Sequence, residues 1–76
     1  MDELRRVVAE TFRVRAESLS GASNGATVPG WDSVGHLNLV LAVEEHFHVR
    51  FTTEEISQMT DLASIQSLLD GRTRDR

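Results

Sequence analysis

The sequence predicts a small all-α domain of four helices, three main ones and one short one, with a long loop after the first. Three observations support this prediction. The 76 residues are enough for one small domain. Apolar residues recur at helical spacing in several segments, whereas the strand-like run "VRF" is too short to form a sheet. Glycine, proline and serine replace this periodic pattern after the first segment, which indicates a loop.

The first helix is expected over residues 2–14, where apolar side chains recur on one face: Leu4, Val7, Val8 and Phe12. A loop follows over residues 15–32. A loop of this length is unusual in so small a domain and indicates a long crossover between the first two helices. Three apolar residues are its expected anchors on the core: Leu19, Val28 and Trp31.

The second helix is expected over residues 33–48, with Asp32 or Ser33 as its N-cap. At about 100° per residue, its apolar residues fall into two stripes. The first stripe includes His36 and is expected to face the core: Leu39, Val40, Val43 and Phe47. The second stripe lies on the opposite flank: Val34, Leu37 and Leu41. A helix with one buried face does not need this second stripe, which therefore either packs on the third helix or forms an exposed docking surface.

Two further helices complete the predicted domain. The short third helix is expected over residues 53–59, behind a threonine cap. The fourth is expected over residues 61–70, with Thr60 as its cap and with one apolar face: Leu62, Ile65, Leu68 and Leu69. Gly71 suits a left-handed C-cap, so residues 71–76 are expected to form a solvated, frayed tail.

Composition excludes several classes of protein and site. The chain has no cysteine, so it has neither disulfides nor thiolate metal sites. The charged N-terminal segment does not resemble a signal peptide, and no apolar run reaches the roughly 18 residues of a membrane span. We therefore expect a cytoplasmic protein with no membrane partner. We also expect a monomer and, because the chain starts with its own Met1 and shows no linker, a discrete protein. Residues 32–70 hold seven acidic residues and one basic residue, a balance that repels nucleic acid and attracts basic protein surfaces.

Neither a catalytic triad nor a metal site is expected. Asp32, Ser33 and His36 lie close in sequence, but neighbouring helical residues point in different directions and no oxyanion hole is evident. The three histidines, His36, His46 and His48, have poor spacing for one helix face. Structural or solvated roles are expected for each of them.

The position of Ser33 at the start of a helix leaves two interpretations open. A helix N-terminus presents unpaired N–H groups and a positive dipole end, which favour a phosphate. An exposed serine hydroxyl at that place can therefore become a phosphoester. The simpler interpretation is that Ser33 only caps the helix.

The segment "GWDSVGHLNLVLAVEEHFHVRFTTEEISQMTDLASIQSLL" resembles the acyl carrier proteins and the related peptidyl carriers. Its "DSV" is similar to their Asp-Ser-Leu signature, with valine in place of leucine. The resemblance extends over essentially the whole chain: its length, the order of four helices, the long first loop and the acidic "VEEHF". It implies the four-helix bundle of a carrier protein.

The resemblance implies that Ser33 receives 4′-phosphopantetheine from coenzyme A, through a separate phosphopantetheinyl transferase that uses Mg²⁺. Acyl groups would then be held as thioesters on the terminal thiol, so the protein would be a carrier and not an enzyme. Asp32 matches the acid that helps to position the domain on the transferase. The other positions that match partner-binding sites are Val34, Leu37, Asn38 and Leu41, the acids Glu44 and Glu45, and as secondary candidates Glu54, Glu55 and Asp61.

Three departures from the family pattern bear on the pathway. Fatty-acid carriers typically have acids two and five residues after the modified serine, where this chain has Gly35 and Asn38. His46 stands where a third consecutive acid is common. We therefore expect a carrier of specialised polyketide or peptide biosynthesis, served by an acyl- or aminoacyl-loading enzyme and a synthase or acyltransferase. The alternatives are a carrier for fatty-acid or cell-envelope acyl transfer and, in another class, an unmodified helical interaction module.

Apolar residues of the last three helices are also candidates for a crevice that shelters an acyl chain. The candidates are Leu37, Leu41, Ile56, Met59 and Ile65, although core packing is favoured for the last three.

Overall fold

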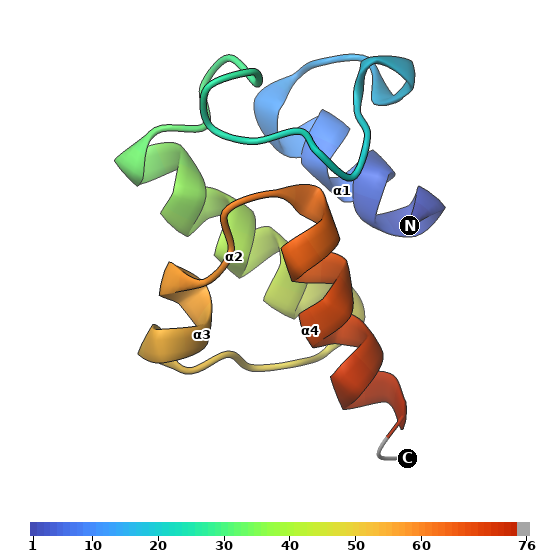
Figure 1. The fold of residues 1–76 in the computed structure, drawn as a ribbon, viewed down its shortest axis with the longest axis vertical. Coiled ribbons are helices and arrows are strands. Elements are labelled where there is room, and N and C mark those ends of the chain that lie inside the picture. Colours follow the sequence, from blue (N-terminus) through green and yellow to red (C-terminus); the bar gives the residue numbers. More distant parts are fainter. Residues whose placement is uncertain (75–76) are drawn as a thin grey trace.

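The computed structural model describes residues 1–74 and shows an all-α fold, as predicted from the sequence (Figure 1). Its helices are α1 (Asp2–Phe12), α2 (Ser33–Phe47), α3 (Thr53–Ser57) and α4 (Leu62–Arg74). A single 3₁₀ turn, η1 (Ala16–Ser18), interrupts the long first loop. Within residues 1–74 there is no β-strand, and one isolated bridge joins Asn24 to Asp61.

Two helices end in a left-handed residue that is not glycine. Arg13 has φ 57° and ψ 47°, and its N–H donates to the carbonyl of Ala9. This ends α1 at Phe12, two residues earlier than predicted. His48 adopts the same conformation after Phe47 and so ends α2. Neither stop is evident from the sequence, because such a conformation is uncommon outside glycine.

The predictions for the two ends of α4 were wrong. Asp61 caps the helix instead of Thr60, since its Oδ1 accepts a hydrogen bond of 2.8 Å from the N–H of Ser64. The helix also continues through Gly71 as far as Arg74, so the predicted C-cap and the start of the predicted tail are both helical. Residues 75 and 76 lie outside the described residues.

The core lies between α1, α2 and α4, and α3 stands beside it (Figure 1). The predicted core stripe of α2 is confirmed for Leu39, Val40 and Val43, which are buried. The predicted anchors of the first loop are buried too. Among residues 1–72 the buried apolar cluster is Leu4, Val7, Val8, Leu19, Val28, Trp31, Leu39, Val40, Val43, Phe51, Met59, Leu62, Ile65 and Leu69.

The long first loop crosses the start of α4 and satisfies its backbone (Figure 1). The N–H of Leu62 donates to the carbonyl of Ser23 at 3.1 Å, and that of Ala63 to the carbonyl of Gly21 at 3.0 Å. A helix start leaves such N–H groups without intrahelical acceptors. The loop is therefore part of the fold and not a loose connection.

The end of this loop is pressed against the first turn of α2. Gly30 has φ +91°, and a Cβ added at Gly35 would lie 1.9 Å from its carbonyl oxygen and 3.0 Å from the ring of Phe12. No side chain fits at Gly35 unless the backbone moves. The same region contains a stack of the Phe12 and Trp31 rings, whose centroids are 5.8 Å apart.

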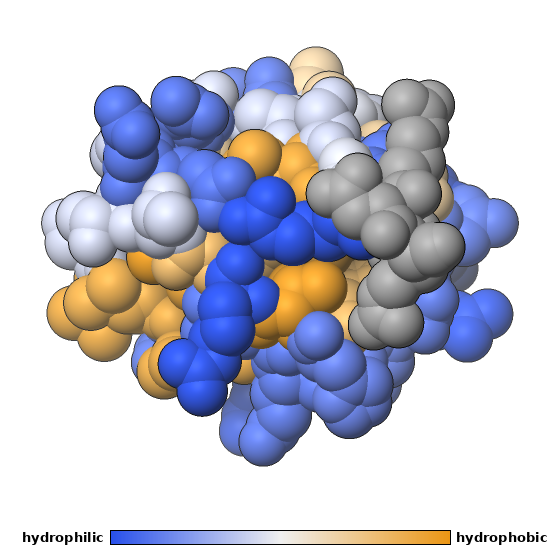
Figure 2. Space-filling model, turned by 90° about the horizontal axis from the view of Figure 1, so that it is seen from below, coloured by the Kyte–Doolittle hydropathy of each residue, from blue (hydrophilic) through white to orange (hydrophobic). Residues whose placement is uncertain are grey.

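The surface around this core carries both apolar and hydrophilic side chains (Figure 2). Figure 2, seen from below the view of Figure 1, shows apolar areas that lie between hydrophilic side chains. Among residues 1–74, no helix has both the length and the apolar character that crossing a bilayer requires.

We predict that Gly35→Ala destabilises the protein by about 1–3 kcal/mol, the usual cost of overpacking, despite the better helix propensity of alanine. Chemical unfolding followed by circular dichroism measures this change. The matched control is Gly71→Ala in α4, where an added Cβ meets no atom within 4 Å. We expect the control to gain up to about 1 kcal/mol, and equal effects of the two substitutions would contradict the prediction.

Candidate functional site

Asp32, and not Ser33, caps α2. The backbone of Asp32 is extended, and its Oδ1 accepts a hydrogen bond of 2.8 Å from the N–H of Gly35. Its carbonyl oxygen accepts a further bond of 2.7 Å from the N–H of His36. The interpretation of Ser33 as no more than a cap therefore does not hold.

Ser33 occupies the first position of α2 and is exposed. Its hydroxyl makes no hydrogen bond to any residue from 1 to 74. The N–H groups of Ser33 and Val34 have no acceptor inside the helix, because the residues that precede α2 are not helical. A nucleophilic hydroxyl thus stands at the positive end of the helix dipole, where an attached phosphate is favoured.

The ring of His36 is held on both sides. Trp31 Nε1 donates to His36 Nδ1 at 2.9 Å, and His36 Nε2 lies 3.0 Å from the carbonyl oxygen of Ile56 in α3. An indole N–H can only donate, so Nδ1 must accept and the hydrogen belongs on Nε2. Both nitrogens are therefore used, and His36 does not form a triad with Ser33.

The predicted second stripe of α2 is exposed. Val34 is 68% exposed, Leu37 58% and Leu41 63%, so these side chains do not pack on α3. Asn38, in the same part of the helix, is also exposed. We name the three apolar residues the α2 patch. Exposed apolar side chains that gather on one helix face are typical of a docking surface.

The acidic candidates divide into two groups. Glu45 and Glu54 are exposed, and their carboxylates make no hydrogen bond or ion pair with residues 1–72. By contrast, Glu44 accepts a hydrogen bond of 2.9 Å from the N–H of Phe51, and Asp61 caps α4. Glu55 completes a capping box with Thr52. Intramolecular bonds thus hold three of the five carboxylates.

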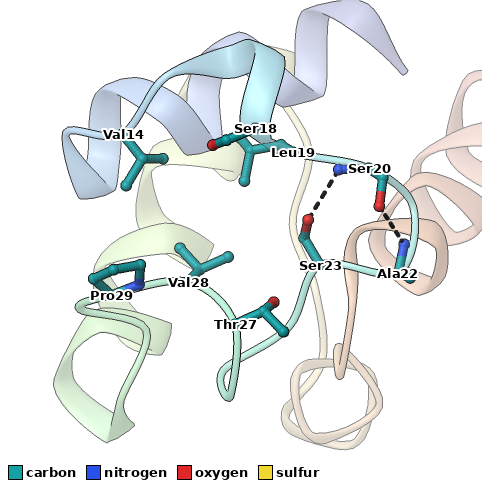
Figure 3. Close-up of a pocket in the computed structure, with 9 residues that line it drawn as sticks. All are labelled: Val14, Ser18, Leu19, Ser20, Ala22, Ser23, Thr27, Val28 and Pro29. Carbon is teal, nitrogen blue, oxygen red and sulfur yellow. Dashed lines mark hydrogen bonds between the residues drawn. The ribbon is translucent and has the colours of Figure 1, made fainter.

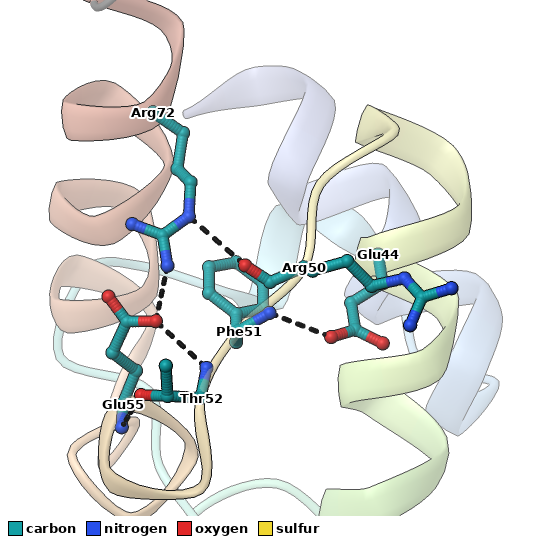
Figure 4. Close-up of polar contacts among 6 residues, drawn as sticks. All are labelled: Glu44, Arg50, Phe51, Thr52, Glu55 and Arg72. Carbon is teal, nitrogen blue, oxygen red and sulfur yellow. Dashed lines mark hydrogen bonds and ion pairs between the residues drawn. The ribbon is translucent and has the colours of Figure 1, made fainter.

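Arg72 is a structural residue that the sequence analysis missed (Figure 4). Its guanidinium bonds to Glu55 and also donates through Nε to the carbonyl of Arg50 at 3.1 Å. It lies 5.2 Å from the ring centroid of Phe51, within the range of a cation–π contact. Arg72 therefore connects α4, α3 and the segment between α2 and α3.

The N–H of Thr52 and, after it, the guanidinium of Arg72 lower the pKa of Glu55 below its ordinary value of 4.5. Both interactions stabilise the charged carboxylate.

One cavity lies in the first loop, and a groove lies beside Ser33. The loop cavity has a volume of about 290 Å³, and its hydroxyl groups are used locally: Ser23 Oγ accepts from Ser20 N, and Ser20 Oγ from Ala22 N (Figure 3). We name the second the Ser33 groove. It is open, has a volume of about 590 Å³, and is lined by Gly25, Trp31, Asp32, Ser33, His36 and Leu37.

The five residues that were predicted to line an acyl crevice lie in different parts of the structure. Leu37 and Leu41 are on the surface, whereas Met59 and Ile65 are 3% and 0% exposed within the core. Ile56 is half-buried against the same core. The core role that was favoured for Met59 and Ile65 is confirmed, and these five residues do not share one cavity wall.

The other histidines form no metal site. His46 Nε2 lies 2.7 Å from Glu3 Oε2 and so links α2 to α1 at the surface. His48 ends α2. Among residues 1–74, no group of three or more histidine, aspartate or glutamate side chains is arranged to hold a metal ion.

The structure is a helical bundle with an exposed serine at the start of its second helix, and the chain is similar to a known carrier protein. The chain is 29% identical over 70 residues to the acyl carrier protein of Campylobacter fetus subsp. fetus (strain 82-40). The aligned region covers 92% of this chain and 91% of its relative. No family model matches. The similarity confirms the resemblance predicted from the sequence and supports the acyl carrier protein family and a carrier role.

We predict that Glu55 stabilises the fold in a pH-dependent way. Its folded pKa lies below 4.5, so its contribution is complete above the unfolded value and is lost as the pH falls through the folded one. The melting temperature of the wild type should exceed that of Glu55→Gln at neutral pH, and the difference should shrink below pH 4.5. Glu54→Gln, at the exposed neighbouring acid, is the control. A difference that does not change with pH would contradict the prediction.

Proposed function

We propose that the protein is a discrete carrier that holds acyl or aminoacyl intermediates as thioesters on a 4′-phosphopantetheine arm attached to Ser33. The proposed setting is specialised biosynthesis of the polyketide or non-ribosomal peptide type. The similarity to an acyl carrier protein supports the carrier role. When attached, the arm supplies a flexible tether and a terminal thiol. The chain itself provides an attachment point and docking surfaces, and catalysis belongs to its partner enzymes.

The observation that most supports Ser33 as the attachment point is the division of roles at the start of α2. Asp32 supplies the cap, which leaves the Ser33 hydroxyl exposed and unbonded among residues 1–74. A serine needed as the cap would have to give up its hydrogen bond before modification. The free N–H groups of Ser33 and Val34 are placed to hold a phosphate oxygen there.

The α2 patch is the proposed contact with partner enzymes. It begins one residue after Ser33, so an enzyme that reaches the arm also meets these side chains. The exposed carboxylates of Glu45 and Glu54 are candidates to steer a basic partner surface. Exposed ion pairs contribute only about 0–1 kcal/mol each, which suits partners that bind and leave quickly.

Gly35 and Asn38 support a specialised pathway. Both stand where fatty-acid carriers typically have acids, and no acidic side chain fits at Gly35 in this fold. The partner surface that meets the start of α2 is therefore expected to be less basic. A carrier for fatty-acid or cell-envelope acyl transfer is the alternative.

Intact-mass spectrometry tests the attachment. After incubation with coenzyme A, Mg²⁺ and a broad-specificity phosphopantetheinyl transferase, we expect the mass to increase by one phosphopantetheine. The increase should vanish in Ser33→Ala and persist in Ser67→Ala, a control at an exposed serine of α4. An unchanged wild-type mass, with a transferase that modifies another carrier, would instead favour an unmodified interaction module.

We predict that Leu37→Asp and Leu41→Asp impair loading without unfolding the protein. Both side chains are more than half exposed, so the stability should change by no more than about 0.5 kcal/mol. The efficiency of transfer by the transferase should fall about tenfold, as a loss of about 1.4 kcal/mol in binding would produce. Ser67→Asp adds the same charge on α4 as a control. A collapse of the melting temperature would show that these residues belong to the core.

A further inference from the structure

We propose that the tether and its cargo lie in the Ser33 groove, outside the helical bundle, and that His36 closes the way to the interior. This inference rests on the proposed function, because it requires a group attached at Ser33. Beyond the proposed function, the inference names a binding site for the tether and a class of cargo, namely short or polar acyl and aminoacyl groups.

The Ser33 groove starts at the attachment point itself. One wall is the first loop at Gly25, where an added Cβ would lie 2.9 Å from the carbonyl oxygen of Trp31. The other wall includes Leu37, which is 58% exposed. The lining also includes the rings of Trp31 and His36, whose centroids are 6.2 Å apart and whose planes are 10° from parallel. A mostly apolar trough of this kind suits the methylene and amide groups of a neutral tether.

His36 stands between this groove and the core. It lies three residues after Ser33, almost one turn further along α2, and its Nε2 reaches the carbonyl oxygen of Ile56 in α3. The Trp31 indole holds the other side of the ring. A chain that entered between α2 and α3 at this end would have to break both hydrogen bonds and expose buried polar groups, which is costly.

Packed side chains also fill the core of the bundle. Leu39 and Ile65 are 0% exposed and Met59 is 3% exposed, and all three belong to the same buried cluster. An inserted acyl chain would have to displace packed side chains as well as break the two hydrogen bonds.

The position of the groove limits the cargo. The groove is open to solvent, so a long aliphatic chain in it would keep much of its surface in water and would forgo about 25 cal/mol for each Å² left unburied. Short or polar groups lose little by staying outside. We therefore expect this carrier to transport such groups without sequestering them.

The test uses the full chain loaded with an octanoyl-phosphopantetheine probe, and mass spectrometry establishes loading first. If no loading occurs, the proposed function is wrong, and the groove proposal falls with it. If loading occurs, the measurements that follow test the groove proposal alone. In the loaded protein, amide signals should shift at Gly25 and Leu37, and so should the indole N–H signal of Trp31, the only tryptophan. Shifts centred on Leu39, Met59 and Ile65 would overturn the inference, because they would place the octanoyl chain inside.

The reactivity of the thioester gives a second measurement. Hydroxylamine should cleave the octanoyl thioester on the wild type at a rate within about twofold of free octanoyl-pantetheine, because an exposed group is accessible nearly all the time. Protection of tenfold or more would overturn the inference.

The variant His36→Ala tests the closing role. If it folds, we expect octanoyl-dependent shifts to appear at Met59 and Ile65 and the thioester to become protected. His46→Ala, at the surface histidine paired with Glu3, is the control and should behave as the wild type does. Interior shifts in the wild type, or none in a folded His36→Ala, would contradict a closing role for His36.

Discussion

The arrangement of the site depends on one histidine ring with two hydrogen bonds. His36 joins the segment before Ser33, through Trp31, to α3, through the carbonyl of Ile56. In the part of the chain that the structure describes, these bonds are the polar link between the segment that precedes α2 and α3. These two hydrogen bonds fix the position of the start of α2 relative to Trp31 and to α3. A ring that already satisfies both of its nitrogens serves to position structure and not to act on Ser33.

The close contact between Gly35 and the backbone of Gly30 affects where acidic side chains can stand near Ser33. Because Gly35 lies against the carbonyl of Gly30, the first turn of α2 has no side chain at that position. Asp32 is exposed, but its carboxylate caps α2, and the other exposed acidic candidates occur later in α2, at Glu45, and in α3, at Glu54. The chain thus presents an apolar patch close to Ser33 and leaves long-range attraction to more distant carboxylates, an arrangement suited to brief encounters.

Polar contacts with distant segments hold both ends of α4. Arg72 binds α3 and the segment before it, and carbonyls of the first loop accept N–H groups at the start of α4. Such contacts matter in a domain of 76 residues, because a chain of this size buries only about 60% of its surface. Two carboxylates that the sequence offered as docking residues, Glu55 and Asp61, serve this internal purpose.

Helical periodicity determined the number and order of the helices and the core face of α2, because apolar residues recur at helical spacing in those segments. The anchors of the first loop were predicted because they are apolar residues in a segment rich in glycine and serine. The sequence left two interpretations of the α2 patch, packing on α3 or exposure to solvent. Only the tertiary structure decided between them, because the three side chains are exposed in the folded chain.

Tertiary structure alone decided the rest: the left-handed stops at Arg13 and His48, the extension of α4, and the partners of His36 and Arg72. These features join residues up to 22 positions apart or depend on non-glycine backbone conformations. Local sequence patterns do not encode them, because they arise only when distant segments meet.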